Sequence, residues 1–245
     1  MLRVESVSKI FGRVAAVDRL SCEVRSGELV GIIGPNGSGK TTLVNLISGF
    51  IKPTSGRILY NGQDITHTAP HKIVGMGISR TFQMVRPFYQ LPAYKNMIIP
   101  LYSPRVRELA GGRYGDRNAV ALDLLEEVGF ERDANVAYKP AGTLPQGYLK
   151  RLELAKAIAL SPQLLILDEL FSGMSLAEVA SVVPVIEKLR MAGKTIIMIE
   201  HRLKELFRIA DRIMVLNYGR KIADGAAAEV MESDEVKKAY LGSEE

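Results

Sequence analysis

A glycine-rich stretch near the start of the chain has the residue types and spacing that hold a row of phosphates. Gly34 is followed by four residues and then by Gly39-Lys40-Thr41, which fits the phosphate-loop pattern. Glycines let the backbone curl tightly, so that several N–H groups point inward at phosphate oxygens. Lys40 supplies a mobile positive charge for the β- and γ-phosphates, and the Thr41 hydroxyl suits Mg²⁺, which prefers oxygen ligands. The residues expected to contact a nucleotide are Gly34, Pro35, Asn36, Gly37, Ser38, Gly39, Lys40, Thr41 and Thr42.

The segments on either side have the patterns that a phosphate loop requires. Residues 29–33 are an apolar run typical of a buried strand, and residues 43–47 resemble the opening turns of a helix. The helix dipole would add positive potential at the loop. A glycine-rich turn that binds nothing is the alternative, but it does not account for a strand before the loop and a helix after it.

Two further apolar runs end in residues that could do chemistry. Residues 164–167 lead into Asp168 and Glu169, which suits a buried parallel strand with carboxylates at its C-terminal edge. Residues 195–199 lead in the same way into Glu200 and His201. A strand that merely ends at the surface is the alternative for Asp168 and Glu169, and the preceding phosphate loop makes it the weaker one.

The composition fits a globular protein without a membrane span or a disulfide. The chain has 245 residues, enough for one large α/β domain or two small ones, and 47% of them are hydrophobic. No apolar run approaches the roughly 18 residues that cross a bilayer, and residues 1–5 lack the pattern of a signal peptide. Cys22 is the only cysteine. We therefore expect a protein of the cytosol.

The remaining elements alternate between β-rich and helical segments. Residues 1–33 show the alternation of strands, and residues 57–65 predict a hairpin that turns at Asn61-Gly62. Residues 84–160 change character, because prolines interrupt the first part and two helical patterns follow. We interpret residues 84–160 as a helical subdomain inserted in a nucleotide-binding core.

Local patterns in the second half make further predictions. Residues 102–118, with four arginines and two adjacent glycines, are expected to form a loop. Pro184 within the helical pattern of residues 177–192 predicts a kink or two shorter helices. The last helical stretch is expected from about residue 227 to residue 241. In the helix that opens at residue 148, the side chains expected to lie outside are Lys150, Arg151, Glu153 and Lys156.

The order of these motifs resembles a single ATP-binding cassette of an ABC transporter, over nearly the whole chain. Residues 34–41 are similar to the Walker A motif and residues 164–168 to the Walker B motif, with Glu169 in the position of the catalytic carboxylate. Gln83 matches the Q-loop, and His201 stands for the switch histidine.

Three other positions complete the resemblance. Residues 172–175 stand for the D-loop. Phe11 falls where an aromatic residue stacks on adenine, although a phenylalanine of the core is an equal alternative on spacing alone. The segment in the place of the signature motif consists of Leu144, Pro145, Gln146, Gly147 and Tyr148.

The resemblance implies an α/β fold, a P-loop NTPase of the ABC cassette type. Its parts are a nucleotide-binding core with a mixed or parallel sheet, an antiparallel β subdomain and an inserted α-helical subdomain. It implies one ATP-binding domain over residues 1–245, with residues 1–83 and 161–245 as core and β subdomain and residues 84–160 as the helical signature subdomain. It also implies ATP and Mg²⁺ as cofactors, and ATP hydrolysis coupled to transport as the activity.

The same resemblance assigns roles to individual side chains. Lys40, the loop amides and Mg²⁺ would neutralise the triphosphate, and Thr41, Gln83 and Asp168 would hold the metal directly or through water. Glu169 would polarise the attacking water as general base, and His201 would contact the γ-phosphate. In this family two cassettes close head to tail on two ATP molecules, and each site borrows the signature motif of the opposite subunit.

The borrowed motif is where the chain departs from the family. The usual Leu-Ser-Gly-Gly-Gln is replaced by residues 144–148, in which Pro145 removes a hydroxyl and a backbone N–H that would face the γ-phosphate. Gln146 adds bulk where the chain must approach the nucleotide closely. Leu170 replaces the proline that usually follows the catalytic carboxylate, and Ser175 replaces the usual Asp or Asn of the D-loop. We therefore expect a second cassette that is a different chain.

Finer similarities indicate one subgroup of the family. Residues 77–83, residues 151–155 and the C-terminal segment resemble ATPases of branched-chain amino acid importers. This implies integral membrane permease subunits and a solute-binding protein as partners, and a peripheral location at the cytoplasmic face of the membrane. Residues 84–99, with Phe88, Tyr89 and Tyr94, are expected to contact a membrane subunit.

Other functions remain open at this point. The altered signature favours a nucleotide-gated structural cassette with low turnover, whereas Glu169 and His201 favour an active ATPase. Relatives that import urea or amides, or that export lipopolysaccharide, share parts of the pattern. A soluble ABC ATPase acting on DNA or ribosomes is disfavoured, because the chain is a single cassette without a coiled coil and its net charge of +5 is spread along the sequence. No nucleic acid partner is expected.

Overall fold

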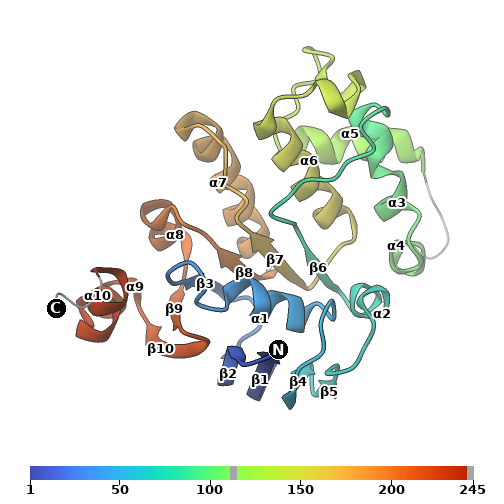
Figure 1. The fold of residues 1–245 in the computed structure, drawn as a ribbon. Helices are drawn as coiled ribbons and strands as arrows, with labels where there is room; N and C mark the ends of the chain where they lie inside the picture. Colours follow the sequence, from blue (N-terminus) through green and yellow to red (C-terminus); the bar gives the residue numbers. More distant parts are fainter. Residues whose placement is uncertain (111–114, 242–245) are drawn as a thin grey trace. The chain divides into compact units, whose positions relative to one another are not determined.

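The computed structural model describes residues 1–110 and 115–241, and the chain folds into two compact units. The first unit contains Met1–Ile73 and Gly193–Glu245, and the second contains Val74–Ala192. Figure 1 labels the elements of both units. Within the described residues, we find no helix that is both long enough and apolar enough to cross a membrane.

The strands closest to the N-terminus form an antiparallel sheet in the first unit. Its order is β2 (Val14–Val24), β1 (Leu2–Phe11), β4 (Ser55–Tyr60) and β5 (Gln63–Asp64) (Figure 1). The register pairs Leu2 with Val24 and Val4 with Cys22, and all four side chains are buried, as the alternation of a strand predicts. The antiparallel pairing of β4 and β5 confirms the predicted hairpin.

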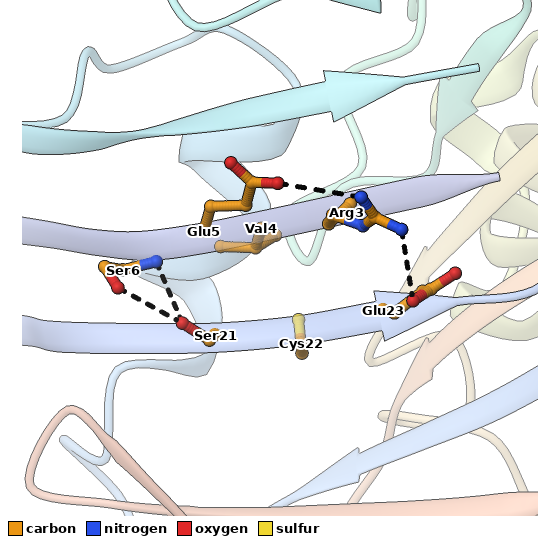
Figure 2. A pocket seen from close by; sticks show the side chains of 7 residues that line it. All are labelled: Arg3, Val4, Glu5, Ser6, Ser21, Cys22 and Glu23. Atoms are coloured by element: carbon orange, nitrogen blue, oxygen red, sulfur yellow. Dashed lines mark hydrogen bonds and ion pairs between the residues drawn. The ribbon is translucent and has the colours of Figure 1, made fainter. Parts of the chain in front are cut away.

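An open depression lies on strands β1 and β2 of this sheet, and Figure 2 shows the side chains that line it. Its polar groups already interact with one another. Arg3 lies 3.8 Å from the carboxylates of both Glu5 and Glu23, and the backbone N–H of Ser6 donates to Ser21 Oγ at 2.9 Å. Exposed ion pairs of this kind contribute about 0–1 kcal/mol to stability, so we assign them a modest structural role.

The second sheet of the first unit combines parallel and antiparallel strands. Its order is β10 (Arg220–Gly225), β9 (Arg212–Asn217), β3 (Leu29–Ile33) and β8 (Thr195–Ile199). Strand β3 runs parallel to both of its neighbours and is buried throughout, whereas β9 and β10 form an antiparallel hairpin. Strands buried on both faces have continuous apolar sequences, which explains the runs at β3 and β8. The two sheets together confirm the predicted fold class.

In the described part of this unit, the α-helices are α1 (Lys40–Ile47), α8 (Leu203–Ile209), α9 (Ala227–Glu232) and α10 (Asp234–Leu241). Helices α9 and α10 lie next to each other in Figure 1. The predicted helical stretch of residues 227–241 is therefore confirmed, but it consists of two helices that are separated at Ser233. Ser233 adopts an extended conformation with ψ 123°, and Asp234 and Glu235 then occupy a new first turn, where acidic side chains are favoured by the helix dipole.

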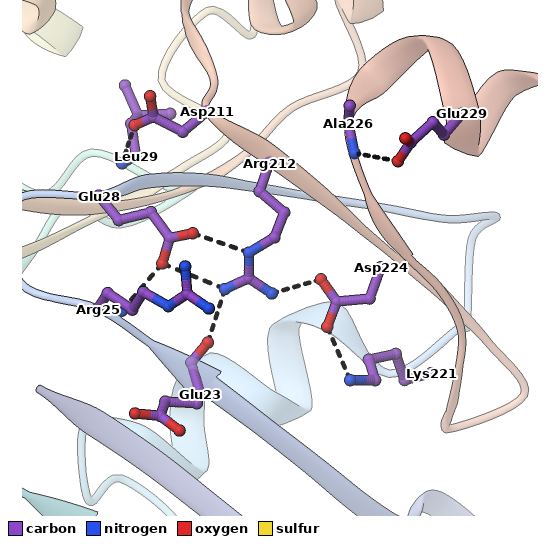
Figure 3. Close-up of polar contacts among 10 residues, drawn as sticks. All are labelled: Glu23, Arg25, Glu28, Leu29, Asp211, Arg212, Lys221, Asp224, Ala226 and Glu229. Carbon is purple, nitrogen blue, oxygen red and sulfur yellow. Dashed lines mark hydrogen bonds and ion pairs between the residues drawn. The ribbon is translucent and has the colours of Figure 1, made fainter.

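One arginine connects the two sheets of the first unit, as Figure 3 shows. Arg212 donates to both carboxylate oxygens of Glu28, at 2.8 and 3.2 Å, and to the carbonyl of Glu23 on β2 at 2.7 Å. It also pairs with Asp224 on β10. Desolvation acts to raise the pKa of Glu28, but the hydrogen bonds and charges of Arg212 and Arg25 together outweigh it, so that this pKa is lowered. The network connects strands β2, β9 and β10 with Glu28, the residue that precedes β3.

The second unit combines a short parallel strand pair with most of the helices. Strands β6 (Ile78–Arg80) and β7 (Leu164–Asp168) pair so that Arg80 lies beside Ile166. The helices are α3 (Ile98–Leu101), α4 (Pro104–Leu109), α5 (Arg117–Glu127), α6 (Gln146–Ala159) and α7 (Leu176–Met191), with 3₁₀ turns at Ala93–Met97, Val136–Tyr138 and Ala141–Thr143. Helix α2 (Pro70–Gly75) spans the sequence boundary between the units.

Two local predictions fail in the second unit. The expected loop contains helix α4, because the Ser103 side chain accepts from the N–H of Val106 and Pro104 occupies the first helical position. Residues 111–114 of that expected loop lie outside the described residues. Helix α7 continues through Pro184, so of the two predicted alternatives, a kink or two shorter helices, the second is wrong. Pro184 and Ala180 are both exposed, and the carbonyl that loses its partner can therefore be hydrated.

Candidate nucleotide-binding site

The phosphate loop lies in the first unit, between the end of β3 and the start of α1. Three of its glycines have positive φ angles: 151° at Gly34, 78° at Gly37 and 102° at Gly39. A Cβ at Gly34 would lie 2.1 Å from the carbonyl oxygen of Leu216, and one at Gly39 would lie 2.4 Å from that of Ala16. The loop thus requires glycine both for its backbone angles and for its close approach to neighbouring strands.

Lys40 lies inside the curl of this loop, although it is a charged residue. It is only 6% exposed, and its Nζ donates to the carbonyl oxygens of Gly34 at 2.8 Å and Pro35 at 2.9 Å. Ser38 Oγ lies 3.4 Å away. The ammonium is therefore held at the position where a phosphate chain bound to the loop amides would meet it.

The turn between β9 and β10 supports the phosphate loop from outside. The N–H of Gly219 donates to the carbonyl of Ser38 at 3.0 Å, and the N–H of Asp18 donates to the carbonyl of Gly219 at 2.9 Å. Tyr240 of α10 reaches the same loop, since its hydroxyl hydrogen-bonds to the backbone of Gly34, and desolvation raises the pKa of Tyr240. Sequence reasoning did not single out Tyr240, because no local pattern connects positions so far apart.

His201 leaves the sheet at the same edge as the phosphate loop. Strands β3 and β8 are parallel neighbours with Ile32 opposite Ile199, and His201 follows Ile199 by two residues. The carboxyl ends of adjacent parallel strands meet at one edge, which is the expected place for a phosphate-contacting pair. Phe11 is 51% exposed at the end of β1, with Lys9 Nζ 5.0 Å from its ring centroid, so its ring is accessible for stacking.

Asp168 ends strand β7 in the second unit, and Arg80 holds one side of its carboxylate. Arg80 Nη2 lies 2.8 Å from Asp168 Oδ2, and the two side chains are 7% and 2% exposed. Thr81 Oγ1 accepts from the Asp168 N–H at 3.1 Å. Desolvation raises the pKa of Asp168, and the charge of Arg80 opposes this shift. An arginine in a buried strand requires a carboxylate nearby. Arg80 in the short strand β6 could therefore have been predicted to pair with a buried acidic residue.

The other carboxylate oxygen of Asp168 is positioned for a cation. Among the described residues, Asp168 Oδ1 is buried and has no hydrogen-bond partner. Leaving a buried carboxylate oxygen unpaired is costly, so such a group demands an explanation. A divalent ion supplies one, because Mg²⁺ accepts carboxylate oxygens. The donor set of Asp168 therefore fits the predicted metal site.

Glu169 and Gln83 meet next to Asp168. Gln83 Nε2 donates to Glu169 Oε2 at 2.8 Å, and Glu169 has φ 49°, a left-handed conformation directly after the strand. This turn leaves Glu169 half-buried, whereas Asp168 is buried. The structure thus brings together the predicted metal ligands and the predicted base of the second unit, with the base at the more accessible position.

The segment 144–148 forms the N-terminus of α6. Pro145 is the N-cap, and a Cβ at Gly147 would lie 1.9 Å from Glu178 Oε1, so a larger residue there would displace the Glu178 carboxylate. Glu178 belongs to a capping box with Ser175 at the start of α7. Ser175 in the D-loop position thus serves as the N-cap of α7, and the Glu178 carboxylate of the same capping box lies beside Gly147 of the signature segment.

Two charged residues of α6 do not lie where periodicity predicts. Lys150 is 1% exposed and Glu153 is 6% exposed, so the prediction that they lie outside is wrong. Glu153 pairs with Lys156 at 2.7 Å. Lys150 Nζ donates to the carbonyls of Gln83 and Glu169. The partners of Lys150 come from distant positions in the chain, which helical periodicity does not reveal, whereas the partner of Glu153 lies one turn away on the same helix.

Comparison with known proteins agrees with this geometry. Residues 17–172 match the family described as ABC transporter, and residues 220–245 match the family described as branched-chain amino acid ATP-binding cassette transporter. The chain is 36% identical to the high-affinity branched-chain amino acid transport ATP-binding protein BraF of Pseudomonas aeruginosa, over 99% of this chain and 98% of that protein. It is 34% identical to LivG of Escherichia coli K12, with the same coverage.

Solved structures give the same answer. A nucleotide-free ATP-binding cassette from an ABC transporter superposes with a TM-score of 0.87 at 30% identity, over 99% of both chains. The ADP-bound conformation of such a cassette gives 0.84 at 31% identity, over 99% of this chain and 98% of that one. These likenesses confirm the resemblance and the fold class predicted from the motifs. The chain belongs to the ABC transporter family and is one of its ATP-binding, ATP-hydrolysing cassettes.

Proposed function

We propose that this cassette powers the import of branched-chain or other small amino acids. The names of its relatives and the match of its C-terminal segment to a branched-chain amino acid transporter family support this substrate class. The observation that carries the catalytic part is the cluster of Gln83, Asp168 and Glu169 at the end of β7. Because the matching family is described as ABC transporter, we propose that the partners of this chain include a membrane protein.

ATP binding would use the phosphate loop of the first unit. The amides of residues 34–42 and the Lys40 ammonium surround the phosphates, and Phe11 stacks on the adenine. Thr41, Gln83 and Asp168 would hold Mg²⁺ directly or through water, with Asp168 Oδ1 as the available carboxylate oxygen. When bound, the ion neutralises charge on the β- and γ-phosphates.

Hydrolysis would then depend on positioned side chains. Glu169 accepts a proton from the attacking water as its oxygen bonds to the γ-phosphorus, while the bond from that phosphorus to the bridging oxygen breaks and ADP leaves. The hydrogen bond from Gln83 to Glu169 must loosen for the carboxylate to face water. His201 contacts the γ-phosphate and keeps it aligned with the water.

The working assembly would contain two cassettes and a membrane permease, at the cytoplasmic face of the membrane. The two cassettes close head to tail, residues 144–148 of this chain face the ATP of the other, and the other is a different chain. Residues 84–160 act as the helical subdomain. A solute-binding protein delivers the amino acid to the permease.

The surface offered to the permease would be residues 84–99. Its exposed apolar side chains are Met84, Phe88, Tyr89, Leu91, Ile98 and Ile99. Contiguous apolar groups on a surface mark interaction sites. Tyr94 differs from the others, because it is half-buried and its ring lies 5.3 Å from that of Tyr138.

The test is solute uptake into proteoliposomes that carry the permease and second cassette from the neighbouring genes. Uptake of labelled leucine should require this chain and ATP on the cassette side. Urea and acetamide serve as competing solutes, because relatives that carry them share parts of the sequence pattern. Uptake of urea in place of leucine would overturn the substrate class. Leucine uptake that persists without this chain would overturn the role as its power source.

A further inference from the structure

A buried lysine on α6 connects the main chains of the two residues that form the Gln83–Glu169 pair. Lys150 Nζ donates to the carbonyl oxygen of Gln83 at 2.9 Å and to that of Glu169 at 3.0 Å. Lys150 is 1% exposed, and it is among the largest fully buried side chains of the chain's described part. All three residues belong to the second unit.

Burying an ammonium group is unfavourable unless it is hydrogen-bonded and its charge is balanced. Here two carbonyl oxygens accept from it, and the carboxylate of Asp168 is close enough for its charge to interact with Lys150. A buried charge of this kind is weak support for stability, because an apolar side chain of similar size often serves as well. Its presence therefore calls for a role in the arrangement of the residues around it.

Lys150 contacts the main chains of Gln83 and Glu169 through their carbonyl oxygens. Gln83 follows strand β6, and Glu169 adopts a left-handed conformation with φ 49° after β7. Their side chains meet through the 2.8 Å hydrogen bond from Gln83 Nε2 to Glu169 Oε2. A single ammonium that holds both carbonyls fixes the distance between the two main chains from which these side chains extend.

We infer that Lys150 is a positioning residue for ATP hydrolysis, which acts by holding the main chains of Gln83 and Glu169 in register. This inference rests on the proposed roles of Gln83 and Glu169, because Lys150 would act through these two residues and not directly on the nucleotide or the attacking water. Because α6 begins at Gln146, the ammonium also ties the helix of the signature segment to these residues. The lysine of the phosphate loop is Lys40, so we expect the loss of the Lys150 ammonium to change the rate of hydrolysis more than the affinity for the nucleotide.

The decisive variant is Lys150→Met, which keeps the length and the apolar stem of the side chain but removes the ammonium. Lys188→Met is the matched control, since Lys188 pairs with Glu127 on the exposed surface. Single-turnover hydrolysis of radiolabelled ATP gives the rate, and a fluorescent ATP analogue gives the affinity, because the chain contains no tryptophan. Loss of a charge-assisted hydrogen bond predicts a rate about tenfold or more below the parent. Affinity should stay unchanged, and Lys188→Met should match the parent in both.

A second measurement separates positioning from simple structural support. Hydrogen exchange followed by mass spectrometry should rise in Lys150→Met for peptides that contain Gln83 and Glu169, and stay unchanged for peptides of the 3₁₀ turn Ala93–Met97. If Lys150→Met does not fold, Lys150→Gln replaces it in both experiments, and its rate should still fall below the parent. A folded variant that hydrolyses ATP at the parental rate would overturn the proposal. A variant whose affinity for the ATP analogue changes and whose hydrogen exchange rises throughout the chain would also overturn it.

Discussion

The double substitution Pro145→Ser with Gln146→Gly tests the altered signature segment most sharply. Pro145 is the N-cap of α6, with φ −57° and ψ 155°, and no side-chain hydrogen bond caps the helix. A serine N-cap adopts an extended conformation of this kind, so the variant fits the present backbone. The change restores a hydroxyl and a backbone N–H and removes one side chain, with little else disturbed.

Stability and activity should respond differently to this change. A serine N-cap stabilises a helix by about 0.5–2 kcal/mol, and a glycine inside a helix costs up to about 1 kcal/mol, so the free energy of unfolding should stay close to the parent's. A hydrogen bond to a charged phosphate contributes about 1.5–3 kcal/mol. At about 1.4 kcal/mol per factor of ten, the restored hydroxyl should raise homodimer activity on the order of 10- to 100-fold.

The assay is steady-state ATPase activity against protein concentration. The parent alone should be slow, the addition of the right partner cassette should accelerate it, and the double variant should be faster than the parent when alone. Pro145→Ala is the control, because it restores the N–H without the hydroxyl and should remain well below the double variant. A parent that turns over briskly and cooperatively by itself would refute the reasoning, as would a double variant no faster than the control.

Three other predictions follow from the contacts described above. Arg80→Met should lower the free energy of unfolding by about 3–5 kcal/mol in urea, because it leaves Asp168 buried without its partner, and a loss near zero would contradict this. Burial raises the pKa of the Cys22 thiol from its usual 9.0 to about 12. The protonated thiol therefore contributes to the free energy of unfolding below pH 9, and this contribution is lost as the pH rises toward 12. A disulfide reagent at pH 8 should modify Cys22 only after the protein unfolds. Cross-linkers placed in residues 84–99 should reach a cytoplasmic loop of an integral membrane protein, and recovery of only soluble partners would count against that surface.

The phosphate loop could be predicted from the sequence because its determinants are local. Glycines with positive φ at Gly34 and Gly39, a strand before them and a helix after them are all written in neighbouring residues. The same holds for the hairpin that turns at Asn61-Gly62. Parallel strands ending at one edge then predict where His201 lies relative to the loop.

Contacts between distant segments could not be predicted in this way. Helical periodicity placed Lys150 outside because lysine is usually solvated, yet its ammonium finds carbonyl oxygens contributed from far along the chain. Arg80 was likewise overlooked, since its buried partner Asp168 belongs to another strand. Pro184 was given too much weight, because an exposed position in α7 lets water replace the lost hydrogen bond.

The central claim is that this cassette hydrolyses ATP with Glu169 as the general base, and Glu169→Gln tests it most directly. The amide preserves an oxygen acceptor for Gln83 Nε2, so the local arrangement should survive while the proton acceptor is lost. We predict that a fluorescent ATP analogue binds as tightly as to the parent and that single-turnover hydrolysis is nearly abolished. Hydrolysis within a few-fold of the parent, in any assembly that is active, would contradict the claim.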